Sequence, residues 1–169
     1  MKNISIALLI SILPCSIYAQ DWTWVSQTGM GALLMDIDQD ENVYIGGSFN
    51  DSLTIGTTTL YSTGFTDVYI AKFDSLGNFI WAFTEGGPGK DNDGSGGLTV
   101  DDVGNIYIVG DFKDSADFSG TIINSIQGSD IYVAKYDTQG ILQWVTQAGG
   151  DFDEGAEDVI VDDSGNIYV

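Results

Sequence analysis

The side chains of this sequence that could do chemistry are almost all carboxylates. It holds 25 aspartates and glutamates against 5 lysines, with no histidine and one cysteine, Cys15. Zinc sites of the usual nitrogen and sulfur type, disulfides, haem ligation and histidine-activated nucleophiles cannot be built from these residues. The formal charge of −20 also predicts no nucleic-acid partner, because phosphates would be repelled. Any catalysis would have to rest on carboxylates.

One acidic segment has the spacing of a calcium loop. Asp91, Asp93 and Ser95 alternate, Gly96 stands at the sixth position and Asp102 at the twelfth. Oxygen ligands at positions 1, 3, 5 and 12 around a glycine at position 6 hold Ca²⁺ in such loops. Calcium is therefore the one cofactor that the sequence suggests, with the side chains of Asp91, Asp93, Ser95 and Asp102 as its ligands. A solvated acidic loop is the alternative, since the twelfth residue is not the usual Glu.

A second alternating series, Asp36, Asp38 and Asp40, also resembles the start of a calcium loop. Only its middle residue is acidic in the related segments of the chain, where Asp101 and Asp162 align with Asp38. We therefore interpret Asp38 as a turn former and Asp36 as a strand residue.

The two lysines at equivalent places, Lys72 and Lys135, favour a structural role over a catalytic amine. In a strand, a lysine in a chain this acidic is expected to pair with a nearby carboxylate. The candidate partners are Asp67, Asp74, Asp130 and Asp137.

The chain repeats itself with a period of just over 60 residues. Asp-x-x-x-Asn-x-Tyr occurs three times, and its tyrosines, Tyr44, Tyr107 and Tyr168, lie 63 and 61 residues apart. Asp-x-Tyr-x-Ala-Lys, followed by a glycine and a tryptophan, occurs twice with the same period. A fixed period of this kind indicates one supersecondary unit stacked several times.

Each unit reads as four β-strands without a helix. In the first unit, short runs rich in β-branched and aromatic residues lie between Gly, Asp and Asn turns; they span 33–38, 43–49, 68–73 and 79–84. The 68–73 run is apolar on both of its alternating faces, so each sheet should be covered on both sides. Four-stranded antiparallel sheets stacked by repetition predict an all-β fold, a β-propeller. The inserts 50–66 and 113–129 should form hairpins.

The first 19 residues have the pattern of a signal peptide. A lysine near the start precedes an apolar run from Ile4 to Leu13, and a small-residue cleavage site ends at Ala19. The run is shorter than the roughly 20 residues that a spanning helix needs, so we expect no membrane insertion after cleavage. A lipoprotein acylated at Cys15 is a weaker alternative, since Pro14 stands where a small residue is expected.

The predicted propeller is incomplete. We divide residues 20–169 into an orphan closing strand at 22–28, a blade at 31–86, a second blade at 94–149 and an incomplete blade at 156–169. Four blades of this length would need on the order of 250 residues. We therefore expect a fragment of a longer chain; a short chain that completes its ring by self-association is the alternative.

The segments that carry the repeat resemble the bacterial SBBP β-propeller repeat. They are Gly-Asn-Ile-Tyr-Ile-Val-Gly-Asp-Phe at 104–112, Gly-Ser-Asp-Ile-Tyr-Val-Ala-Lys-Tyr-Asp at 128–137 and the tryptophan that follows. Lys72, Lys135 and Asn166 fall on the diagnostic positions, while Glu41 replaces the usual glycine. The resemblance implies an exported propeller scaffold without a shared catalytic site. A partial similarity to the tryptophan-docking repeats of quinoprotein propellers covers 71–81 and 134–144.

These observations together predict a secreted or cell-surface protein of bacterial type that is not an enzyme. It would act as a binding or structural scaffold for an extracellular protein or glycan, with loops 85–97 and 149–157 as the natural ligand sites. The rival hypothesis is a fragment of a carbohydrate-active or quinone-dependent propeller enzyme whose catalytic residues lie outside this segment. Fold alone does not decide between them.

Overall fold

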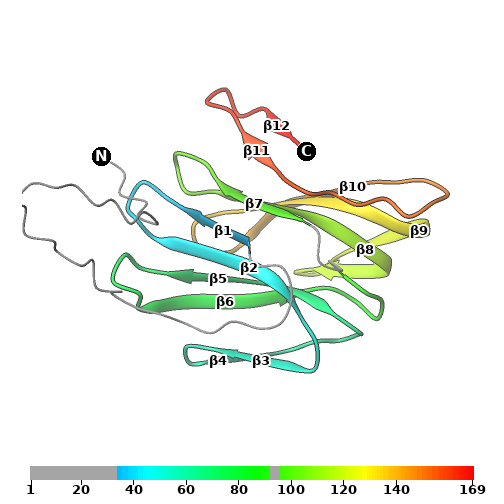
Figure 1. Ribbon diagram of the computed structural model, residues 1–169, viewed down its shortest axis with the longest axis horizontal. Coiled ribbons are helices and arrows are strands. Elements are labelled where there is room, and N and C mark those ends of the chain that lie inside the picture. Colours follow the sequence, from blue (N-terminus) through cyan, green and yellow to red (C-terminus); the bar gives the residue numbers. More distant parts are fainter. Residues whose placement is uncertain (1–33, 92–95) are drawn as a thin grey trace, which may run out of the picture.

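The computed structural model describes residues 34–91 and 96–169, which form strands and turns only (Figure 1). The all-β prediction is therefore confirmed for this part of the chain. None of its segments is a helix that could cross a membrane. The predicted signal peptide, 1–19, and the orphan strand, 22–28, lie outside the described residues.

The first repeat forms a four-stranded antiparallel sheet in the order β1-β2-β5-β6. Its strands are β1 (Leu34–Ile37), β2 (Val43–Phe49), β5 (Asp67–Phe73) and β6 (Phe79–Glu85). They match the four predicted runs, because alternating β-branched and aromatic residues between turn formers are a strong local signal.

The second repeat builds the same sheet again, in the order β7-β8-β9-β10. Its strands are β7 (Gly97–Val100), β8 (Ile106–Phe118), β9 (Thr121–Tyr136) and β10 (Leu142–Ala148). Tyr107 pairs with Lys135 across β8 and β9 as Tyr44 pairs with Lys72 across β2 and β5. The period seen in the sequence is thus a period in strand register.

Both inserts form hairpins, as predicted, but they join their sheets differently. In the first unit β3 (Ser52–Ile55) and β4 (Thr58–Tyr61) are a separate two-stranded sheet. In the second unit the hairpin is a continuation of β8 and β9 past a bulge after Lys113. Asp51 and Asp114, 63 residues apart, both take positive φ at this point, 57° and 69°. The same backbone kink therefore ends a strand in one unit and bulges it in the other.

A third sheet begins with β11 (Ile160–Val161) and β12 (Ile167–Tyr168). The first strands of the three units are neighbours in space, β1 against β7 and β7 against β11 (Figure 1). This stacking of antiparallel sheets by their first strands is similar to the stacking of successive blades in a propeller. The described residues do not close a ring.

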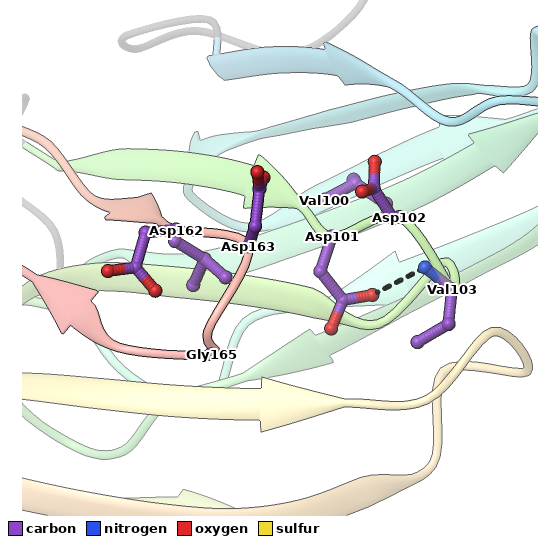
Figure 2. A pocket seen from close by; sticks show the side chains of 8 residues that line it. Val100, Asp101, Asp102, Val103, Asp162, Asp163 and Gly165 are labelled. Carbon is purple, nitrogen blue, oxygen red and sulfur yellow. Dashed lines mark hydrogen bonds between the residues drawn. The ribbon is translucent and has the colours of Figure 1, made fainter.

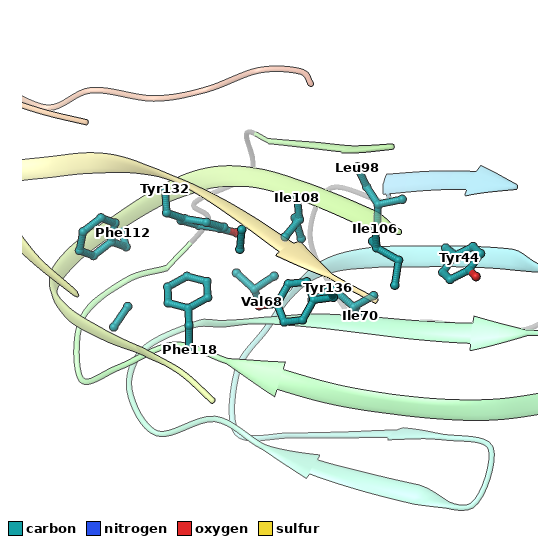
Figure 3. Packing of buried hydrophobic residues seen from close by; sticks show 12 residues of the cluster. Tyr44, Val68, Ile70, Leu98, Ile106, Ile108, Phe112, Phe118, Tyr132 and Tyr136 are labelled. Carbon is teal, nitrogen blue, oxygen red and sulfur yellow. The ribbon is translucent and has the colours of Figure 1, made fainter. Parts of the chain in front are cut away.

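The core lies between the sheets, so each complete sheet is apolar on both faces. The cluster between the first and second sheets joins residues such as Tyr44, Val68 and Ile70 to Ile106 and Tyr136 (Figure 3). The first sheet's other face packs on the β3–β4 hairpin, and the second sheet's other face packs on the third unit. This double cover confirms the inference drawn from the apolar runs.

The antiparallel order gives the stack two different ends. The turns between the first and second strands, and between the third and fourth, lie at one end, the turn end. The inserts and the connections between sheets, such as 86–96, lie at the other, the linker end. Glu41 takes a φ of 63° where Gly104 and Gly165 have 87° and 79°. The turn thus needs a left-handed residue, and Glu41 is the strained copy.

Candidate functional site

The turn end is built on one aspartate per turn. Oδ1 of Asp101 accepts hydrogen bonds from the amides of Val103 and Asn105 at 3.1 and 2.8 Å. Its Oδ2 accepts from Nδ2 of Asn105 at 2.7 Å and from the hydroxyl of Tyr107 at 3.2 Å. Asp-x-x-x-Asn-x-Tyr is therefore a turn in which the carboxylate holds the backbone and the next strand together.

The same four hydrogen bonds occur in the other two copies. Asp38 accepts them from Asp40, Asn42 and Tyr44, and Asp162 from Ser164, Asn166 and Tyr168. Positions 44 and 107 thus have equivalent surroundings, as stacked copies of one unit require.

These hydrogen bonds keep the turn carboxylates ionised. Burial raises the pKa of Asp101, but hydrogen bonds from Asn105, Val103 and Tyr107 outweigh it, and the pKa lies below its ordinary value. The pKa of Asp38 is lowered in the same way, with the charge of Lys72 adding to the effect. The hydrogen bonds of these carboxylates therefore serve to stabilise the turns.

The turn tyrosines of the first two units also contact a lysine and a tryptophan. Nζ of Lys72 lies 4.8 Å from the ring centroid of Tyr44, and Trp81 meets that ring edge-on at 6.2 Å. In the second unit the corresponding distances are 5.0 Å from Lys135 to Tyr107 and 6.4 Å from Trp144. The recurrent lysine is thus a cation–π partner.

The predicted ion-pair partners of Lys72 were wrong. Nζ of Lys72 lies 3.8 Å from Oδ2 of Asp38, not beside Asp67 or Asp74. The pairing register explains this: Lys72 stands opposite Tyr44, whose hydroxyl reaches the same carboxylate. Asp67 lies at the far end of the same strand, at the linker end.

A groove runs between the turns of consecutive units, and we call it the turn groove. Between the second and third units it has a volume of about 230 Å³ and is lined by Val100–Val103, Val161–Asp163 and Gly165. In Figure 2 the carboxylates of Asp102 and Asp163 point to one side, and those of Asp101 and Asp162 point to the other. A second pocket lies between the turns of the first two units; it shares Asp102 and Val103 with the first and is also lined by Gln39 and Asp40.

Hydrogen bonds fix the first two units to each other beside this groove. Oδ2 of Asp36, on β1, accepts hydrogen bonds from the amide of Val100 at 2.8 Å and from the hydroxyl of Thr99 at 3.1 Å, both on β7. Nε2 of Gln39 donates to Oδ1 of Asp102 at 2.8 Å. The groove is therefore a defined surface whose exposed groups are acidic.

The structure places the aspartates with the spacing of calcium loops in different parts of the fold. Asp36 bridges two sheets and Asp38 holds a turn, as the repeat indicated. Asp91 lies at the linker end, bridged to Phe112, whereas Asp102 lies in the turn that follows β7 at the turn end. Asp93 and Ser95 lie outside the described residues, so the predicted loop stays a prediction. In the described part of the chain, no three histidine, cysteine or carboxylate side chains converge as metal ligands.

The linker end holds a pair of carboxylates that sequence reasoning missed, which we call the acid pair, Asp67 and Asp91. Both side chains are 1% exposed. They meet beside Gly86: a Cβ on this glycine would lie 2.7 Å from Cγ of Asp67 and 2.8 Å from Oδ2 of Asp91. The amide of Gly87 donates to the same Oδ2 at 2.6 Å.

Burial dominates the electrostatics of the acid pair. It raises the pKa of Asp91 to about 7, with the charges of Asp67 and Asp111 adding to it and the amides of Gly87 and Lys113 opposing it. Burial also raises the pKa of Asp67, although hydrogen bonds from Thr63 oppose it. The pKa values of these carboxyls are therefore raised, whereas those of the turn-end aspartates are lowered.

A second copy of the acid pair lies 63 residues later, at Asp130 and Glu154. The amide of Glu154 donates to the Ser129 carbonyl at 2.7 Å, as that of Asp91 does to Thr66 at 3.0 Å. The amide of Gly150 donates to the Glu154 carboxylate at 3.1 Å, and Asp130 lies against Gly149. Two glycines followed by an acid four residues after the second, repeated with the period, were the signal in the sequence.

Comparison with known proteins finds one distant similarity and no matching family model. The chain is 25% identical over 138 residues to the uncharacterized WD repeat-containing protein L264 of Acanthamoeba polyphaga mimivirus. The match covers 70% of this chain and 9% of that protein. Together with the stacked antiparallel sheets, it supports a β-propeller-like repeat fold.

Proposed function

We propose that this chain is part of a β-propeller scaffold that binds a partner through the turn groove and is not an enzyme. The proposal rests on the difference between constant and variable positions within the turns. Their frame, Asp, Asn and Tyr, is the same in three copies, whereas the residues between Asp and Asn that line the groove differ: Gln39 and Asp40, then Asp102 and Val103, then Asp163. A constant frame that presents variable residues is how repeat scaffolds acquire ligand specificity.

The chemistry of the groove favours a basic protein segment. Asp40, Asp102 and Asp163 are exposed carboxylates on one surface, and Val103 adds an exposed apolar side chain there. A cationic peptide would gain charge complementarity, which raises specificity and association rate more than affinity. Glycans are the alternative ligands, since carboxylates and amides also bind sugar hydroxyls.

We further propose that the protein is exported and of the SBBP repeat type, as its signal-like residues 1–19 and its repeat segments indicate. Expression of the full chain in a bacterium tests this part. The expected product, found outside the cytoplasm, begins at Gln20, after cleavage behind Ala19. Retention in the cytoplasm with Met1 intact would contradict export, and would leave the binding proposal to its own test.

Binding is tested with a peptide array of graded net charge and a glycan array. The groove variant is Asp102→Lys with Asp163→Lys, and the matched control is Asp151→Lys with Glu157→Lys, which makes the same charge change on exposed residues away from the turns. The proposal expects the wild type and the control to bind a subset of basic peptides, and the groove variant to bind them at least about tenfold more weakly.

Two outcomes would overturn this proposal. If both variants lose peptide binding equally, the attraction is that of the net charge and not of the groove. Suppose instead that the wild type selects no peptide, and that the wild type and both variants bind glycans equally well. The groove would then not be the recognition site.

A further inference from the structure

The acid pair leaves carboxylate oxygens without a hydrogen-bond partner in a buried place. Oδ2 of Asp67 accepts from the amide and hydroxyl of Thr63 at 2.9 and 3.0 Å, and Oδ2 of Asp91 accepts from Gly87. The Oδ1 atoms of both side chains accept no hydrogen bond from the described residues. An uncompensated buried carboxylate is costly, and here two lie together.

A third buried oxygen without a partner belongs to another strand. The hydroxyl of Tyr132, on β9 and fully buried, has none among the described residues. Burial raises the pKa of Tyr132, and the charge of Asp91 raises it most among its neighbours, followed by Asp111 and Glu85. Figure 3 shows its ring in the layer between the two sheets, near Val68, the neighbour of Asp67. Oxygens from both sheets are thus left unsatisfied in one region.

We propose that the acid pair, Asp67 and Asp91, binds a hard divalent cation, calcium, at the linker end of the junction between the first two sheets. Two carboxylates supply the charge that such a cation needs, and main-chain carbonyls and water supply the rest of its six to eight oxygen ligands. The cation would tie β5 to the segment that leads into the second sheet.

The repeat supports this site independently of the burial argument. Asp130 and Glu154 keep two carboxylates at the corresponding positions, although Asp has become Glu. Oδ1 of Asp130, in a fully buried side chain, is also without a partner in the described part of the chain. Glu154 is only half-buried, so the second copy should bind more weakly. A position that merely filled space would not need to retain an acid.

The test uses the full chain and measures its melting temperature in EDTA and in millimolar CaCl₂. Calcium should raise the melting temperature of the wild type by about 5 °C, as expected for a ligand well above its Kd that binds only the folded state. Asp67→Asn and Asp91→Asn should each abolish most of this shift. Because an asparagine oxygen can still accept the bonds from Thr63 or Gly87, both variants should fold and melt in EDTA no lower than the wild type.

A matched pair of variants separates this site from the loop predicted from spacing alone. That loop shares Asp91 but needs Asp93 and Asp102, and does not involve Asp67. Asp93→Asn and Asp102→Asn should therefore keep the calcium shift. The proposal is overturned if the shift survives Asp67→Asn, if Asp102→Asn abolishes it, or if neither calcium nor magnesium changes the melting temperature of the wild type.

Discussion

The two ends of the sheets use the same residue type in opposite ways. At the turn end, Asp101 has four hydrogen-bond donors around it and a lowered pKa. At the linker end, Asp91 is more deeply buried, faces Asp67 and has a raised pKa. The difference follows from the donors available: a tight turn offers backbone amides, whereas the acid pair meets another carboxylate.

This contrast separates the carboxylates that hold the fold together from those that could bind an ion or a proton. The turn aspartates have hydrogen-bond donors for both carboxylate oxygens, so they fix the shape of each turn and leave the neighbouring positions to vary. The linker-end carboxylates are incompletely satisfied, and such groups are where a bound ion or a proton has the largest effect.

The largest expected effect is the loss of a turn aspartate. Asp101→Ala should lower the free energy of unfolding by about 3 kcal/mol, because four donors lose an acceptor at about 1 kcal/mol each and water replaces part of it. The control Asp163→Ala, an exposed aspartate in the third turn, should change it by less than about 0.5 kcal/mol. Chemical denaturation measures both, and equal losses would show that the turn carboxylate has no special role.

The acid pair should reverse the usual pH dependence. The folded-state pKa of Asp91 is about 7 against an ordinary value of 3.8, so the folded protein binds the proton more tightly. This contribution to stability is fully present below 3.8 and is lost as pH rises through 7. In EDTA, lowering the pH from about 8 to about 5.5 should therefore stabilise the protein by about 2 kcal/mol.

The variant Asp91→Asn isolates this effect. Raised pKa values at Asp67 and Glu85 act in the same direction, whereas the lowered ones of the turn aspartates act only in acid. The asparagine variant should lose most of the slope between pH 8 and pH 5.5. An unchanged slope would assign the pH dependence to other groups.

Relief of the strained turn should have a smaller effect. Glu41→Gly should stabilise the protein by about 1 kcal/mol, the cost of a left-handed Cβ less the added entropy of the unfolded chain. Gly165→Ala makes the reverse change in the equivalent turn and serves as the control. The added Cβ would meet nothing within 4 Å, and the φ of Gly165 is 79°. It should destabilise by a similar amount; thermal melts that moved both variants in the same direction would contradict the equivalence of the turns.

The smallest expected effect compares the two lysines. Lys72 has both the Tyr44 ring and the Asp38 carboxylate, while for Lys135 the interaction found is with the Tyr107 ring. Lys72→Met should therefore cost about 0.5 kcal/mol more than Lys135→Met. Denaturation curves of the two variants check this, and a larger loss at Lys135 would reverse the assignment.

The sequence predicts local features of the fold well. The first unit's strands and the positive φ required at Glu41 follow from residue type and short-range pattern, and the period predicts that Tyr44 and Tyr107 are equivalent. Double burial of the sheets also follows, because apolar residues occupy both faces of residues 68–73.

Contacts between distant segments could not be predicted in the same way. The partner of Lys72 depends on strand register, which places it beside Asp38 and away from the aspartates nearest in sequence. The acid pair joins residues 24 positions apart through a connection between sheets. The calcium spacing linked Asp91 to Asp102, but β7 lies between these two residues in the chain, and Asp91 is at the linker end while Asp102 is at the turn end.

The most direct test of this account is an NMR titration of the side-chain carboxyl carbons in the folded protein in EDTA. The account predicts that Asp91 titrates near pH 7 while Asp38, Asp101 and Asp162 titrate below their ordinary value of 3.8. Titration of Asp91 together with the turn aspartates near pH 4 would contradict it, because the two ends of the sheets would then not differ.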